Sequence, residues 1–142
     1  MRAVSLSPGL RTLVAGLACV AAVANAADGI VVIGHPNLTS LDVPTLEKVY
    51  TGKVIEVNGV PVTAVNASSG SGVRSRFLHV YLKQDEDKYT AYWIVRRYIG
   101  KGAPPRELAT SEAVIAFVKT TPGAIGYVDE ADVPAGVTVL LK

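Results

Sequence analysis

The stretch between residues 60 and 82 constrains the fold of this chain more than any other. Its first part, residues 60–65, is an apolar run of the length of a strand, and its last part carries Val73, Phe77 and Tyr81 at helical spacing. The residues between them are small or polar and include Gly70 and Gly72. A strand, a short loop and a helix in succession form the unit from which α/β folds are built, so we predict such a unit here.

The loop of this unit has the composition of an anion-binding site. Backbone N–H groups at a helix start lie at the positive end of the helix dipole, where they attract anions. Serine hydroxyls add donors, glycines let a ligand approach the backbone, and an arginine adds a charge suited to oxyanions. The predicted anion-binding residues are Ser68, Ser69, Gly70, Ser71, Gly72, Val73 and Arg74. The same Ser–Gly sequence also suits helix capping and turns, which require no ligand.

Arg74 has two interpretations. On a helical wheel it falls on the side of Val73, Phe77 and Tyr81, which is the apolar side of the predicted helix. A charge on an apolar face needs either a counter-charge or a cleft, because burying an unpaired charge is costly. A bound anion and a structural ion pair would neutralise the Arg74 charge equally well.

Motifs for nucleotide binding and catalysis are not indicated. The loop lacks the Lys-Ser/Thr pair that a P-loop carries after its last glycine, and Ser75 stands where a dinucleotide fingerprint has its third glycine. Ser69 stands where a nucleophile elbow has glycine. The two histidines, His35 and His79, are too few for a metal cluster. We therefore expect no catalytic residue, no metal, no cofactor and no enzymatic activity.

The N-terminus has the pattern of a signal peptide. Arg2 and Arg11 precede the short apolar run Leu13–Ala24, and Ala24-Asn25-Ala26 fits a cleavage site. We expect residues 1–26 to be a signal peptide and residues 27–142 to be a single periplasmic or secreted domain, with no membrane insertion after cleavage. Losing the two arginines leaves 12 basic against 12 acidic residues, so the basic pI of the whole chain does not indicate nucleic-acid binding.

The rest of the chain alternates strand and helix patterns. We predict strands over residues 29–34, 124–128 and 137–141, a hairpin over 53–65 turned at Asn58-Gly59, and helices over 44–50, 88–99 and 110–120. Tyr89, Tyr92 and Trp93 have helical spacing and are expected in the core rather than stacked on a ligand. The predicted fold class is α/β, a single small three-layer lobe with a mixed β-sheet flanked by helices.

Three segments resemble the periplasmic phosphate-binding proteins. Residues 46–53, LEKVYTGK, resemble the end of one of their helices, and residues 65–82, with Gly70-Ser71-Gly72, resemble their phosphate loop. Residues 122–128, PGAIGYV, resemble their most recognisable signature. The likeness covers nearly all of residues 27–142 and is greatest to short single-lobe members of the type II periplasmic binding protein superfamily.

This resemblance implies an exported, non-enzymatic solute-binding module for a small oxyanion, phosphate first, linked to an ABC transporter. Val73 replaces a threonine of the family loop, and Asn66 and Ala67 occupy the region that carries an arginine in the family. The ligands usually given by the family's first lobe have no clear match, and Thr39 and Ser40 are the only candidates for them. A transporter permease or a second protein would complete the site. The alternative is an interaction or sensory module that keeps the fold and has lost tight ligand binding.

Overall fold

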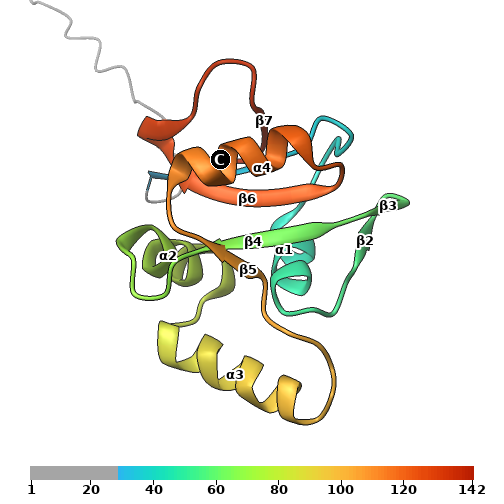
Figure 1. The fold of residues 1–142 in the computed structure, drawn as a ribbon, viewed down its shortest axis with the longest axis vertical. Helices are drawn as coiled ribbons and strands as arrows, with labels where there is room; N and C mark the ends of the chain where they lie inside the picture. Colours follow the sequence, from blue (N-terminus) through green and yellow to red (C-terminus); the bar gives the residue numbers. More distant parts are fainter. Residues whose placement is uncertain (1–28) are drawn as a thin grey trace, which may run out of the picture.

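The computed structural model describes residues 29–142, which form a mixed five-stranded sheet and a separate small hairpin (Figure 1). The predicted signal peptide and its cleavage site lie outside the described residues. The order of the sheet is β5-β4-β6-β1-β7, with β4 parallel to β5 and β6, and β1 antiparallel to β6 and β7. Its strands are β1 (Ile30–Gly34), β4 (Thr63–Ala67), β5 (Arg106–Leu108), β6 (Ala124–Asp129) and β7 (Thr138–Leu141).

Helices cover both faces of this sheet, which confirms the predicted three-layer α/β lobe. On one face α4 (Ser111–Thr120) packs Val114 and Val118 against apolar side chains of β1, β4 and β6. The other face is covered by α1 (Val43–Tyr50), α2 (Gly72–Phe77) and the π-helical turn Leu78–Leu82. The central strands β1 and β6 are therefore apolar on both faces, as their continuous apolar sequences predict.

The helix starts are capped as their sequences predict. The side chains of Asp42, Ser71, Asp85 and Thr110 each accept a hydrogen bond from a backbone N–H one turn later. The helix after Asp85 is α3 (Glu86–Tyr98), whose Tyr89 and Trp93 are buried as expected. No helix among residues 29–142 is long and apolar enough to cross a membrane.

Two features differ from the sequence prediction. The predicted strand over residues 60–65 is divided at Val62, so that β3 (Val60–Pro61) pairs with β2 (Glu56–Val57) in the hairpin while β4 joins the main sheet. The short edge strand β5 was not predicted, because its sequence has no strand periodicity and it pairs only with β4. Pairing of β4 with β5 and β6 joins residues far apart in sequence, which local patterns do not reveal.

Candidate functional site

The predicted anion loop lies where β4 ends and α2 begins. Ser71 is the N-cap of α2, and its Oγ accepts from the N–H of Arg74 at 3.3 Å. The N–H of Ser71 itself donates to the carbonyl of Ser68 at 3.1 Å, which closes the turn between strand and helix. The loop therefore has the strand–turn–helix geometry that its sequence predicts.

A network of buried side chains holds the end of β4 that leads into this loop. The hydroxyl of Tyr127 donates to Asn66 Oδ1 and accepts from the N–H of Ala67, both at 3.0 Å. Asn66 Nδ2 donates to the hydroxyl of Tyr89, which in turn donates to the carbonyl of Tyr50 at 3.0 Å. Burial raises the pKa of Tyr127 and of Tyr89, so these hydroxyls stay protonated donors. Asn66 thus serves as a structural link between strand and helices.

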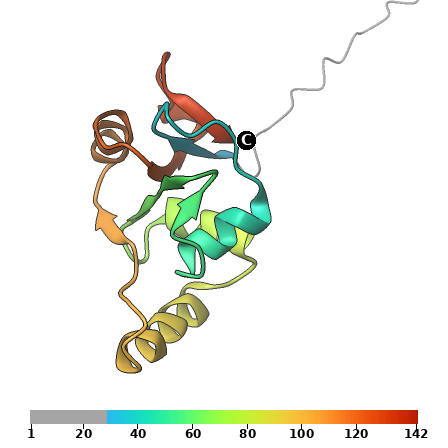
Figure 2. The ribbon, with the colours of Figure 1, turned by 90° about the vertical axis from the view of Figure 1, so that its right-hand side faces the viewer.

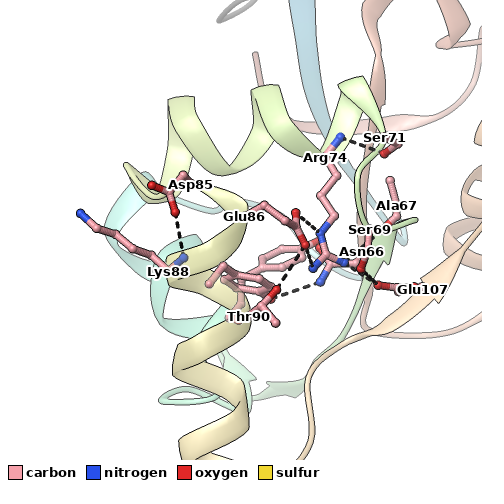
Figure 3. Close-up of polar contacts among 12 residues, drawn as sticks. Asn66, Ala67, Ser69, Ser71, Arg74, Asp85, Glu86, Lys88, Thr90 and Glu107 are labelled. Atoms are coloured by element: carbon pink, nitrogen blue, oxygen red, sulfur yellow. Dashed lines mark hydrogen bonds and ion pairs between the residues drawn. The ribbon is translucent and has the colours of Figure 1, made fainter.

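Arg74 is buried and makes two ion pairs (Figure 3). Its Nε and Nη2 donate to the two carboxylate oxygens of Glu86 at 2.9 and 2.7 Å, which is bidentate pairing. Its Nη1 donates to Glu107 Oε1 at 2.7 Å and to the carbonyl of Ala67 at 3.3 Å. The guanidinium also lies 5.4 Å from the ring centroid of Tyr89. All three guanidinium nitrogens therefore have acceptors within the chain.

This arrangement favours the ion-pair interpretation of Arg74. Two carboxylates face one guanidinium, so the cluster of Arg74, Glu86 and Glu107 carries a formal charge of about −1 and would repel an approaching anion. The Ser69 hydroxyl also donates to Glu107 Oε1, so that carboxylate takes up a second donor of the predicted loop. Glu86 is the first residue of α3 and follows Asp85, a run of acidic residues that suits a solvated helix start, but its carboxylate is turned toward Arg74.

The predicted residues divide between two cavities. Ser69 and Arg74 line a cavity of about 210 Å³ together with residues of α3 and with Glu107. Ser68, Ser71 and Val73 line a smaller one of about 80 Å³ between the starts of α2 and α4. Gly70 and Gly72 line neither cavity, and Gly72 is exposed at the first position of α2.

The structure does not bring Thr39 and Ser40 to the loop. They follow β1, which is antiparallel to β6, and the N–H of His35 donates to the carbonyl of Ala124 where β6 begins. Because β4 runs parallel to β6, this is the sheet edge opposite to the Ser68–Arg74 loop. Ser40 lines a different cavity, beside Asp42 and α1.

The smaller cavity is also lined by Thr110 and Ser111, which are not among the site residues predicted from the sequence. Thr110 is the N-cap of α4 and Ser111 is its first residue, and both line this cavity opposite Ser68 and Ser71. The Ser111 hydroxyl is engaged, since it donates to Asp132 at 2.8 Å. No carboxylate side chain is among the residues that line this cavity. The Thr110-Ser111 pair could be recognised in the sequence as a helix start. Its position beside the Ser68–Arg74 loop could not, because that position depends on the pairing of β5 with β4.

No family model matches the chain, and no curated protein matches it. Solved structures do share its fold. A phosphate ABC transport receptor from Vibrio cholerae aligns with a TM-score of 0.55 and 15% identity, over 79% of this chain and 45% of that one. A putative phosphate ABC transporter substrate-binding protein from Clostridium perfringens, solved with bound phosphate, aligns with a TM-score of 0.55 and 22% identity. This alignment covers 79% of this chain and 44% of that one. PstS from Borrelia burgdorferi aligns with a TM-score of 0.58 and 16% identity, over 80% of this chain and 46% of that one.

These alignments cover most of this chain and less than half of each other chain, so the chain spans under half the length of the proteins it matches. The matched part contains a mixed sheet flanked by helices, as in residues 29–142. The chain therefore has the fold of a single lobe of the periplasmic phosphate-binding proteins.

Proposed function

We propose that this chain is an exported, non-enzymatic binding module for a small oxyanion, with phosphate as the first ligand to test. The observation that carries the proposal is the cavity between the starts of α2 and α4. It is lined by five hydroxyl-bearing residues and by no carboxylate: Ser68, Ser71, Thr110, Ser111 and Tyr127. Its volume of about 80 Å³ accommodates several water molecules or one small tetrahedral anion.

The two helix starts supply the donors. The first N–H groups of an α-helix have no partner within the helix. This applies to Val73 in α2 and Ser111 in α4, which line the cavity, and to Gly72, which stands between the two lining residues Ser71 and Val73. Both helix dipoles direct their positive ends toward this region. Arg74 has no part in this version of the site, because its guanidinium is occupied by Glu86 and Glu107.

We expect the affinity to be low. The matched proteins have more than twice the length of this lobe, and two of them are named for phosphate transport, one with phosphate bound. A charge-assisted hydrogen bond contributes about 1.5–3 kcal/mol, so a site that has only one lobe's donors should bind in the millimolar range. An ABC transporter permease, or another protein that covers the cavity, would raise that affinity by supplying the remaining donors.

Replacing Gly72 tests the backbone donors without removing a side chain. Gly72→Pro deletes one N–H at the first helical position, where proline is well accepted, and Ser71 before it already has the extended conformation that proline requires. Gly72→Ala keeps the N–H, and a Cβ at this position meets no atom within 4 Å. We expect Gly72→Pro to weaken phosphate binding about tenfold or more and Gly72→Ala to leave it unchanged.

The measurement is chemical-shift mapping of residues 27–142 during titration with phosphate and with sulfate. Phosphate should first move the amides of residues 69–73 and 110–112. Saturable binding that leaves both sets of amides unmoved would contradict the proposed site. N-terminal sequencing of protein recovered from the cell envelope checks export, for which we expect a new N-terminus after Ala26, whereas an intact Met1 would contradict it.

The second candidate is an interaction or sensory module that keeps the fold without tight ligand binding. The internal neutralisation of Arg74 favours it, because Glu107 already accepts from both Ser69 and Arg74. Failure of phosphate, sulfate and related anions to bind, in calorimetry as well as in shift mapping, would favour this candidate over the first.

A further inference from the structure

The helix α3 ends in a cluster of exposed apolar side chains. Its Tyr89 and Trp93 are buried against the domain. On the last turns, Ile94 is 63% exposed and Tyr98 is 91% exposed, which makes Tyr98 the most exposed aromatic side chain among residues 29–142. Figures 1 and 2 show α3 at the end of the molecule opposite to β7, where another molecule can reach it. A contiguous exposed apolar cluster of this kind marks an interaction surface.

The cavity of about 210 Å³ lies beside this cluster, and we call it the α3 cavity. It has an apolar wall, made by Trp93, Ile94, Pro104 and Pro105, and two exposed charged residues, Arg97 and Glu107. Arg97 forms no ion pair within residues 29–142. The Ser69 hydroxyl and Arg74 Nη1 both donate to Glu107 Oε1, and no donor within the same residues bonds to Glu107 Oε2. The cavity therefore combines an apolar wall with one available cation and one available acceptor.

These groups suit a tyrosine side chain. The apolar wall accepts the ring, the Arg97 guanidinium can lie over the ring face, and Glu107 Oε2 can accept a hydrogen bond from the phenolic hydroxyl. The volume corresponds to about seven water molecules, which is close to the size of one substituted aromatic ring. Tyr98 does not line the α3 cavity of its own chain, although it follows Ile94 by one turn. A second copy of the chain can supply that ring.

Antiparallel packing of two α3 helices about a two-fold axis brings each Tyr98 to the α3 cavity of the other copy. Asp87, Ala91, Ile94 and Tyr98 are spaced by three or four residues, so they share one stripe of the helix, and all four are exposed. Placing Tyr98 of one helix opposite Ala91 of the other sets a large side chain against a small one. Ala91 is next to Thr90 and one turn before Ile94, which both line the α3 cavity, so the ring arrives beside it.

The charges of α3 match in the same arrangement. The acidic residues at the start of the helix are Asp85, Glu86 and Asp87, and the basic residues at its end are Arg96, Arg97 and Lys101. An antiparallel pair sets each acidic start beside the other basic end, and the register above puts Asp87 beside Lys101. A parallel pair would set like charges together, and a surface of one charge would attract one end and repel the other. The full set of charges therefore favours a second copy in the antiparallel orientation.

We infer that this protein forms a symmetric dimer through α3, in which Tyr98 of each copy enters the α3 cavity of the other. Such an isologous interface is the commonest kind in homodimers. Tyr, Trp and Arg, which meet at this contact, are the residues that most often carry the binding energy of interfaces. One pair of helices makes a small interface, so we expect a dissociation constant of about 10–100 μM. The contact is separate from the α2–α4 cavity and does not depend on oxyanion binding there.

Sedimentation equilibrium of residues 27–142, from micromolar to millimolar concentration, tests the inference. We expect the monomer to convert to a dimer over this range. Tyr98→Ala should weaken the dimer about tenfold or more, because two rings are lost from each dimer. Tyr98→Phe keeps the ring and loses only the hydroxyl, so it should weaken the dimer less. The matched control is Ile55→Ala, which removes a side chain that is 78% exposed and lies outside α3, and it should dimerise as the unmodified domain does.

A charge exchange tests the antiparallel orientation. Asp87→Lys alone, or Lys101→Glu alone, should weaken the dimer about fivefold, because the two-fold axis repeats each like-charge contact. The two substitutions in one chain restore opposite charges across the axis and should recover dimerisation. Lys119→Glu makes the same change on the exposed side of α4 and should have no effect. All of these positions are exposed, so the melting temperature of the monomer should stay unchanged in each variant.

A domain that stays monomeric at millimolar concentration would overturn the inference. So would a dimer that Tyr98→Ala leaves intact, because that dimer would use another surface. Failure of the double charge variant to recover dimerisation would contradict the antiparallel pairing of α3 on which the inference rests.

Discussion

Gly123→Ala should destabilise the domain by about 3–5 kcal/mol, the largest effect that we expect from a single added carbon. Gly123 has a φ of +75° in the turn between α4 and β6, and a Cβ there would lie 1.9 Å from the carbonyl oxygen of Pro61. The overlapping atom is backbone and cannot rotate away. The same residue also joins three segments, because its N–H donates to Asn37 Oδ1 and its carbonyl accepts from the N–H of Thr63.

Gly136→Ala is the matched control for this substitution. Gly136 has a similar φ of +84°, but a Cβ there meets no atom within 4 Å. Its cost should therefore be only that of the left-handed backbone, about 1–2 kcal/mol. Urea unfolding of both variants measures the difference. Equal losses would contradict the close approach of Pro61 to the start of β6.

Arg74→Ala should lower the free energy of unfolding by about 3 kcal/mol. The substitution removes a side chain that is only 5% exposed, together with its bonds to Glu86, Glu107 and the carbonyl of Ala67. The carboxylate partners are partly exposed and can regain water, which keeps the loss below that of a fully buried pair. The cluster connects α2, α3 and β5, so its loss should also loosen the packing of α3.

Arg97→Ala is the control for Arg74→Ala, because Arg97 is exposed on α3 and forms no ion pair within residues 29–142. Its replacement should change stability by less than about 0.5 kcal/mol. Denaturant unfolding of both variants, with and without phosphate, separates the two interpretations of Arg74. If Arg74→Ala leaves stability intact and abolishes stabilisation by phosphate, the guanidinium is a ligand of the anion and the ion-pair account is wrong.

The local elements of this protein could be predicted because their causes lie within a few residues. Asp42 and Thr110 cap their helices by accepting from the N–H three residues later, and such bonds depend only on nearby sequence. The burial of Tyr89 and Trp93 followed from helical spacing in the same way. The mixed α/β lobe followed from the alternation of these local patterns, and the matched structures share that fold.

The sequence by itself thus determined most of the elements, the fold class and the position of the loop between β4 and α2, but not the edge strand β5 or the division of β3 from β4. Only the tertiary structure decided how Arg74 is used, because its partners Glu86 and Glu107 stand 12 and 33 residues away and come from α3 and β5. It also decided that Thr110 and Ser111 lie beside Ser68 and Ser71, since this needs the pairing of β5 with β4. A buried charge selects its partner from whatever folding brings within hydrogen-bond distance, and local patterns carry no information about that distance.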